Sequence, residues 1–180
     1  MELTLQCNAR LQPKHRFPLE DAIDELLEKE GLGEVTGGGT SMNPDHEIAY
    51  CTIDIYLKQS TQAALMQLVS LLTNQIRIPK GSLLQSKRGK MQIGTLEGLA
   101  YYSNGIDLPD EVYRTCDINY VIEQMSLAMD GIGKLYSYWE GNEHTALYFY
   151  GFSFAKMKES IEPFVKTYPL CQKCRIEQIA

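Results

Sequence analysis

No apolar run of this chain is long enough to cross a membrane. The longest apolar stretch, residues 63–72, is interrupted by Gln67 and Ser70 and is far shorter than the roughly 20 residues that a membrane-spanning helix needs. Residues 1–5 lack the basic segment and apolar block of a signal peptide. We therefore predict a cytoplasmic protein without a membrane partner.

Positive charge is also scarce. The chain has 17 Lys and Arg against 23 Asp and Glu, a formal net charge of −6. Duplex nucleic acid is bound mainly by neutralising its phosphates with Lys and Arg, and the densest basic segment, residues 87–90, has only three cations. We predict no nucleic-acid partner, and an acidic surface suited to a basic protein.

A paired cysteine framework is missing. The five cysteines are an odd number, Cys7, Cys51, Cys116, Cys171 and Cys174, whereas a secreted disulfide scaffold usually pairs them. Cys171 and Cys174 form a C-x-x-C that we place in or beside the last strand, where side chains three apart point to opposite faces. A zinc site needs four ligands, and no second pair exists. We predict reduced, mostly buried thiols and no cofactor.

No catalytic motif stands out. The glycine run at residues 37–39 lacks the following helix and the Lys-Ser/Thr of a phosphate-binding loop, so we predict a tightly twisted strand end, with close approach of a ligand or partner backbone as the alternative. Two hairpin tips pair a histidine with a carboxylate, Asp45 with His46 and Glu143 with His144. If these tips meet, metal-assisted hydrolysis is conceivable; otherwise they are solvated turns, and the protein is not an enzyme.

The chain does contain an internal repeat. Residues 25–35 and 123–135 each form an amphipathic helix that ends in Gly-aliphatic-Gly, with an offset near 100 residues. Glycine just past a helix end takes the left-handed conformation. Each half then continues with two strands, a second helix and a closing strand. The second helices are predicted at residues 61–74 and 155–168, and the closing strands at 82–86 and 171–179.

Local signals predict where the helices begin and end. Pro18 suits the first turn of the first helix, Ser60 or Thr61 caps the second, and Asp117 caps the third. Pro163 lies within the fourth helical pattern and predicts a kink or break near Glu159. A strand within residues 91–102 is expected to open the second half.

Each half therefore has the order β-α-β-β-α-β. This order is that of the ferredoxin-like fold, a four-stranded antiparallel sheet with two helices on one face. We predict an α+β protein of two tandem ferredoxin-like halves, residues 1–90 and 91–180, that could pack as a pseudo-two-fold pair.

One hairpin of the second half is rich in aromatic residues. Alternation places Tyr148, Tyr150 and Phe152 on one face and Leu147 and Phe149 on the other, whereas a two-layer sheet should bury only one face. The spare face either packs on the first half or binds a ligand, RNA stacking being disfavoured by the negative charge. The candidate binding residues here are Tyr136, Tyr138, Trp139, Glu140, Glu143, His144 and Tyr150.

Residues 31–40, followed by Glu47, Ile48 and residues 51–55, resemble small uncharacterised bacterial proteins, some of which are similar to the cytosolic immunity proteins of toxin systems. The resemblance covers the first 90 residues. It implies an inhibitor that sequesters a toxin domain, commonly a nuclease with a basic active site.

Two binding functions follow. In the first, Glu20, Asp24 and Glu28 on the first helix complement a cationic cleft of a partner protein, with aromatic anchors near Trp139. In the second, a cleft between the halves, lined by tyrosines and carboxylates, makes the chain a small-molecule-binding regulatory module. We expect a monomer or weak dimer in either case.

Overall fold

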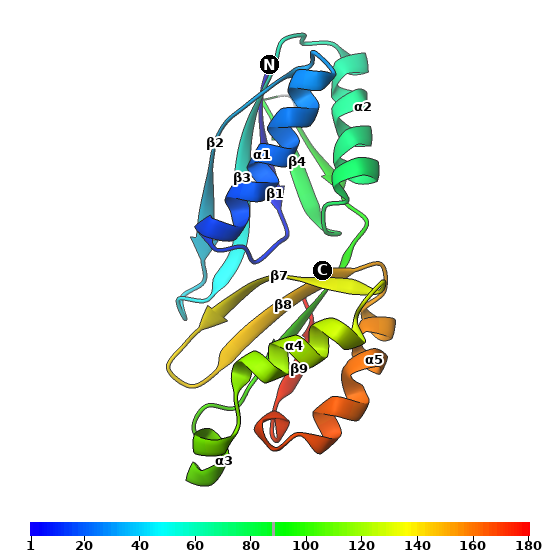
Figure 1. Cartoon of the computed structure of the whole chain (residues 1–180). Coiled ribbons are helices and arrows are strands. Elements are labelled where there is room, and N and C mark those ends of the chain that lie inside the picture. The colour runs from blue at the N-terminus through cyan, green and yellow to red at the C-terminus, as the bar shows by residue number, and fades with distance from the viewer. Residues whose placement is uncertain (88) are drawn as a thin grey trace. The chain divides into compact units, whose positions relative to one another are not determined.

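The chain folds into two units, Met1–Leu96 together with Ala180, and Glu97–Ile179. The structure is a computed structural model (Figure 1) that describes residues 1–87 and 89–180. Arg88, one of the three cations of the basic segment, lies outside the described residues. We call them unit 1 and unit 2.

Unit 1 has a five-stranded antiparallel sheet in the order β2-β3-β1-β4-β5, with α1 and α2 on one face (Figure 1). Its elements are β1 (Glu2–Cys7), α1 (Pro13–Lys29), β2 (Gly33–Met42), β3 (Ile48–Leu57), α2 (Gln62–Ser70), a π-helical segment η1 (Leu71–Ile76), β4 (Ser82–Ser86) and β5 (Gly89–Ile93).

Unit 2 has a four-stranded antiparallel sheet in the order β7-β8-β6-β9. Its elements are β6 (Glu97–Tyr102), α3 (Asp110–Thr115), α4 (Ile118–Ala128), β7 (Gly133–Glu140), β8 (Thr145–Gly151), α5 (Phe154–Thr167), a short 3₁₀ segment η2 (Pro169–Cys171) and β9 (Arg175–Gln178). In both units the first strand lies between the third and the fourth, which is the ferredoxin-like order. The predicted fold is confirmed for each half.

The hydrophobic core of each unit follows from strand alternation. In unit 1, Leu5 pairs with Ile53, and both are buried together with Ile23 and Leu27 of α1. Burying an aliphatic side chain of this size stabilises a fold by about 1.5–3 kcal/mol. In unit 2 one cluster joins the sheet to α4 and α5; it contains Leu99, Tyr101, Leu147, Phe149, Val121, Met125, Met157 and Ile161.

The two units share local irregularities as well as strand order. Gly31 and Gly131, just past α1 and α4, have φ values of 65° and 70°, as predicted for helix-ending glycines. The second strand of each unit also has a β-bulge, between Val35 and Gly37 in β2 and between Leu135 and Ser137 in β7. These paired details indicate that the halves are structurally equivalent along this stretch.

The expected helix caps are present. The Thr61 hydroxyl accepts a hydrogen bond from the Ala64 amide at 3.2 Å, and the Asp117 carboxylate accepts one from the Asn119 amide at 2.8 Å. Each satisfies a backbone donor that the first turn leaves without an intrahelical partner.

The predicted position of Pro18 was wrong, and the break predicted near Glu159 is absent. α1 begins at Pro13, so Pro18 lies inside the helix rather than in its first turn. α5 likewise continues past Glu159 and includes Pro163. Each internal proline removes one backbone hydrogen bond. The helices persist because their apolar faces are buried in the unit cores.

The strand predicted within residues 91–102 is in fact two strands. β5 pairs with β4 as an extra strand of the first sheet, and β6 opens unit 2. The connection between them turns at Gly94, whose φ of 109° suits glycine.

The glycine run lies inside β2, next to the β-bulge between Val35 and Gly37. The ion pair between Arg16 and Glu20 of α1, 2.7 Å long, covers the strand at this point. A Cβ atom on Gly38 would meet the Glu20 carboxylate and would lie 2.6 Å from the Thr52 carbonyl oxygen. Glycine at position 38 therefore allows the ion pair to pack directly on the sheet.

Substitution of Gly38 tests this account. We expect Gly38→Ala to lower the free energy of unfolding by about 2 kcal/mol, because the added methyl group overpacks the buried ion pair. Gly37→Ala is the matched control, since its Cβ would meet only Asp54 Oδ2 at 3.9 Å. Urea denaturation of both variants measures the difference, and equal losses would contradict the proposed packing.

Candidate functional site

A row of four residues crosses the sheet of unit 2. Trp139 of β7 is directly opposite Ala146 of β8, Ala146 is opposite Tyr102 of β6, and Tyr102 is opposite Arg175 of β9. Residues directly opposite in an antiparallel pair have their Cβ atoms about 4.5–5.5 Å apart on the same face. The face is the one opposite to Leu147 and Phe149, which belong to the helix-side core.

His144 completes this row. Its ring centroid lies 5.3 Å from that of Trp139 and 5.3 Å from that of Tyr102, distances typical of favourable aromatic pairs. The small side chain of Ala146 separates the two strands' large rings in the row. We call Trp139, His144, Tyr102 and Arg175 the aromatic row.

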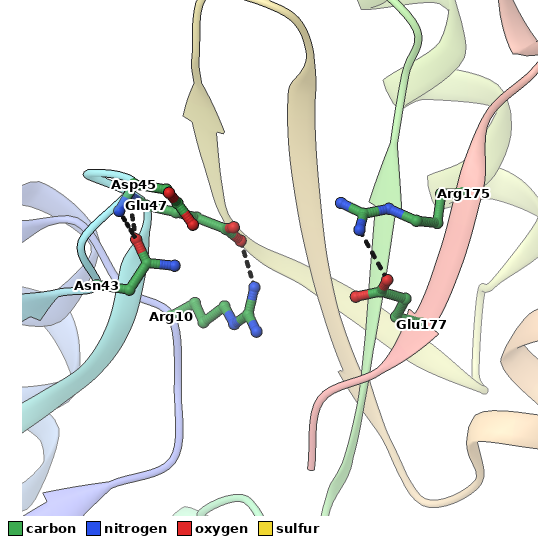
Figure 2. A network of polar contacts seen from close by, with 6 residues as sticks. All are labelled: Arg10, Asn43, Asp45, Glu47, Arg175 and Glu177. Carbon is green, nitrogen blue, oxygen red and sulfur yellow. Dashed lines mark hydrogen bonds and ion pairs between the residues drawn. The ribbon is translucent and has the colours of Figure 1, made fainter.

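Arg175 is the last residue of the row, and its guanidinium contacts the Tyr102 ring and the Glu177 carboxylate. Its guanidinium carbon lies 4.1 Å from the centroid of the Tyr102 ring, within the range of a cation–π interaction. Arg175 Nη1 also lies 3.0 Å from Glu177 Oε1 (Figure 2). The site therefore already holds one guanidinium between an aromatic ring and a carboxylate.

Backbone contacts hold the turn between β7 and β8. The Gly141 amide donates to the His144 carbonyl at 3.0 Å, and the Gly105 amide donates to the Glu143 carbonyl at 2.8 Å. The Thr145 amide donates to Ser103 Oγ at 3.1 Å. These bonds attach the turn to the segment that follows β6, and so they fix the position of His144.

The other predicted residues of this hairpin have different positions. Glu140 and Glu143 are exposed beside the row. Tyr138 packs against the helix-side core. Tyr150 is only 1% exposed, and the Tyr136 ring lies 5.0 Å from it.

Both faces of β8 are buried, including Tyr148 at 0% exposure. The spare face of this strand is therefore not an open ligand-binding surface. At the end of the hairpin, Trp139 and His144 are half-buried and their neighbouring carboxylates are exposed.

Two of the three carboxylates predicted on α1 are engaged within unit 1. Glu20 forms the ion pair with Arg16, and Asp24 Oδ1 accepts a hydrogen bond from the Val35 amide at 2.6 Å. Glu28 is exposed. The exposed carboxylates of this helix are instead Asp21, Glu25 and Glu28, spaced by four and three residues along one face.

The hairpin tip of unit 1 is held by polar contacts (Figure 2). Glu47 forms an ion pair with Arg10, and Asn43 Oδ1 accepts hydrogen bonds from the amides of Asp45 and Glu47 at 3.0 and 2.9 Å. His46 adopts a left-handed backbone with φ of 62°. Asp45 and His46 are exposed, whereas Glu47 is buried.

Within residues 1–87 and 89–180, no group of three or more His, Cys, Asp or Glu side chains is arranged to hold a metal ion. Over the same residues, no helix is long and apolar enough to cross a membrane. His46 belongs to unit 1 and His144 to unit 2.

The C-x-x-C lies in a turn directly beside the last strand, as predicted, and not within it. Cys171 ends η2, and the Cys174 amide donates to the Cys171 carbonyl at 3.3 Å. β9 begins only at Arg175. The turn brings Cys171 and Cys174 close together, whereas two residues three apart in a strand would point to opposite faces.

Comparison with known proteins assigns no family to the chain. It matches no protein-family model and no curated protein. Among solved structures it is similar to the first two RRM domains of a yeast poly(U) binding protein, at 10% identity and a TM-score of 0.24, over 100% of this chain and 99% of that one. A likeness this low carries no argument about what this chain binds.

The prediction that nucleic acid is not a partner stands corrected. The matched structure is that of a poly(U) binding protein, and net charge alone does not exclude such a partner. Net charge is a property of the whole chain, whereas a nucleic acid contacts only one surface of a protein. We therefore withdraw that exclusion.

The packing of Trp139 on the turn can be tested by spectroscopy, because it is the only tryptophan. A Cβ on Gly141 would overlap the indole and lie 2.9 Å from its Cζ2 atom. We expect Gly141→Ala to displace the indole towards water and shift its fluorescence emission to longer wavelength. Asn142→Ala, at the exposed neighbour, should leave the emission unchanged; an equal effect in both variants would contradict this geometry.

Proposed function

We propose that this chain is a binding protein that sequesters a basic partner protein, as immunity proteins do with toxin domains. The observation that carries the proposal is the aromatic row, in which Trp139, His144 and Tyr102 form continuous ring contacts beside the exposed carboxylates of Glu140 and Glu143. Aromatic side chains and charge complementarity are typical anchors of protein interfaces.

The charge distribution supports a cationic partner. Residues 97–180 contain 12 acidic and 7 basic side chains, a formal charge of −5, whereas residues 1–96 contain 11 acidic and 10 basic, a formal charge of −1. Most of the net negative charge of −6 therefore belongs to the unit that has the aromatic row. A surface of one sign attracts an oppositely charged partner and speeds association.

The chemistry of Arg175 indicates which cation suits the site. A guanidinium is planar, stacks on aromatic faces and pairs with carboxylates. Arg175 satisfies both preferences through Tyr102 and Glu177. By the same chemistry, an arginine of the partner would stack on Trp139 and pair with Glu140 or Glu143.

α1 offers a second acidic surface in unit 1. Asp21, Glu25 and Glu28 are exposed on one face of the helix, and we assign to them the role first expected of Glu20, Asp24 and Glu28. An inhibitor of a nuclease would use such carboxylates against the basic active site of its target.

Binding to defined peptides tests the proposal. We expect an arginine-rich peptide to bind more tightly than a lysine-rich peptide of equal charge, measured by fluorescence anisotropy of the labelled peptide. Trp139→Ala should weaken binding of the arginine-rich peptide by about tenfold, or about 1.4 kcal/mol. Leu127→Ala is the matched control, because Leu127 is 64% exposed on α4 of the same unit.

The same titration separates the competing functions. Single-stranded oligouridine and the lipophilic cation tetraphenylphosphonium are measured alongside the peptides. Tighter binding of oligouridine, saturable binding of the small cation alone, or equal losses in Trp139→Ala and Leu127→Ala would each overturn the proposal.

A further inference from the structure

Cys171 and Cys174 lie at the two ends of a β-turn. The Cys174 amide donates to the Cys171 carbonyl at 3.3 Å, Gln172 has φ −62° and ψ 141°, and Lys173 has φ 56°. These angles are those of a type II turn, whose end Cα atoms are less than about 7 Å apart. Disulfides span Cα separations of about 4.4–6.8 Å, so the turn brings the two cysteines within bonding range.

The turn is held in this conformation by a contact of its own. Position 173 has the left-handed backbone that usually requires glycine, yet it is a lysine. Lys173 Nζ donates to the Asp107 carbonyl at 2.9 Å. That hydrogen bond stabilises a conformation that local preference disfavours, and it keeps the two cysteines close.

A buried hydroxyl lies next to Cys171. Tyr101 is 0% exposed, and no nitrogen or oxygen atom of the described residues forms a hydrogen bond with its hydroxyl group. Burial, followed by the adjacent Cys171 thiol, raises the pKa of Tyr101 far above its ordinary value. A neutral phenol beside Cys171 is a hydrogen-bond donor for the thiolate that forms when this cysteine reacts, and a buried donor without another partner is costly.

The cysteines differ in access to solvent. Cys174 is half-buried, whereas Cys171 is 2% exposed. Cys7 and Cys51 are directly opposite in β1 and β3 and are both 0% exposed. Among the described residues, the pair in the turn combines bonding range with one sulfur that a reagent can reach; Cys116 is also half-buried and acts on the pKa of Cys171.

We propose that Cys171 and Cys174 are a reversible oxidation site that closes to a disulfide by exchange with a small-molecule disulfide such as oxidised glutathione. The Cys174 thiolate attacks one sulfur of glutathione disulfide, the S–S bond breaks, and one glutathione leaves as its thiolate and takes up a proton. Cys171 then attacks Cys174 Sγ, and the second glutathione leaves in the same way. Two protein thiols are oxidised to one disulfide while one glutathione disulfide is reduced to two thiols.

The reaction is slow but ordered. Burial raises the pKa of Cys174 to about 11, and it also raises the pKa of Cys171, an effect that the neighbouring Tyr101 hydroxyl opposes. Exchange requires the thiolate, so the small thiolate fraction near neutral pH limits the rate. Cys174 reacts first because it is the more accessible sulfur.

The test uses the full-length reduced chain incubated with oxidised glutathione. After free thiols are alkylated in denaturant, peptide mapping should show Cys171 linked to Cys174, with the loss of two hydrogen atoms, and Cys7, Cys51 and Cys116 alkylated. Dithiothreitol should reverse the change. No linkage, or linkage of Cys171 to Cys116, would overturn the proposal.

Two variants test the order of events. Cys171→Ala should retain one glutathione on Cys174, because the resolving thiol is gone, whereas Cys174→Ala should gain none while folded. Glutathione retained on Cys174 in the unmodified chain would show that Cys171 does not reach it, and this result would refute closure. Circular dichroism verifies that both variants are folded.

Tyr101→Phe tests the role of the hydroxyl group. We expect the Cys171–Cys174 disulfide to form several-fold more slowly in this variant, because the Cys171 thiolate loses its hydrogen-bond donor. Tyr50→Phe in unit 1 is the control, and its disulfide should form at the original rate. An unchanged rate in Tyr101→Phe would contradict the role given to Tyr101.

Discussion

The register of β8 against its two neighbouring strands determines which side chains of unit 2 lie in the core and which form the aromatic row. Because Ala146 is opposite both Trp139 and Tyr102, two large rings from different strands flank one methyl group, and His144 contacts both rings from the adjoining turn. The same alternation directs Leu147 and Phe149 to the helices. A shift of one residue would exchange the two faces, so the core and the aromatic row depend on a single pairing.

The fold was predictable because its signals are local and occur twice. Helix-ending glycines, the Thr61 and Asp117 caps and strand alternation specify the order of elements, and that order limits the sheet topology. The errors arose where a tertiary contact overrides a local preference. Pro18 and Pro163 are accommodated within helices because the faces of α1 and α5 are buried.

The site was only partly predictable for a related reason. Trp139, Glu140, Glu143 and His144 are neighbours in sequence, so one hairpin revealed them. Tyr102 and Arg175 come from strands whose pairing with that hairpin depends on sheet order, and no local pattern marks them. Glu20 and Asp24 looked like solvent-facing carboxylates, but their partners, Arg16 and the Val35 amide, become neighbours only after α1 packs on β2.

The paired bulges of β2 and β7 have a consequence for the chain in concentrated solution. Both strands are at the edge of their sheets, where exposed backbone groups can recruit a strand from another molecule. An extra residue in each edge strand interrupts the regular spacing of those groups and increases the local twist. Each half therefore has, in the β-bulge of its edge strand, a feature that opposes fibre-like assembly.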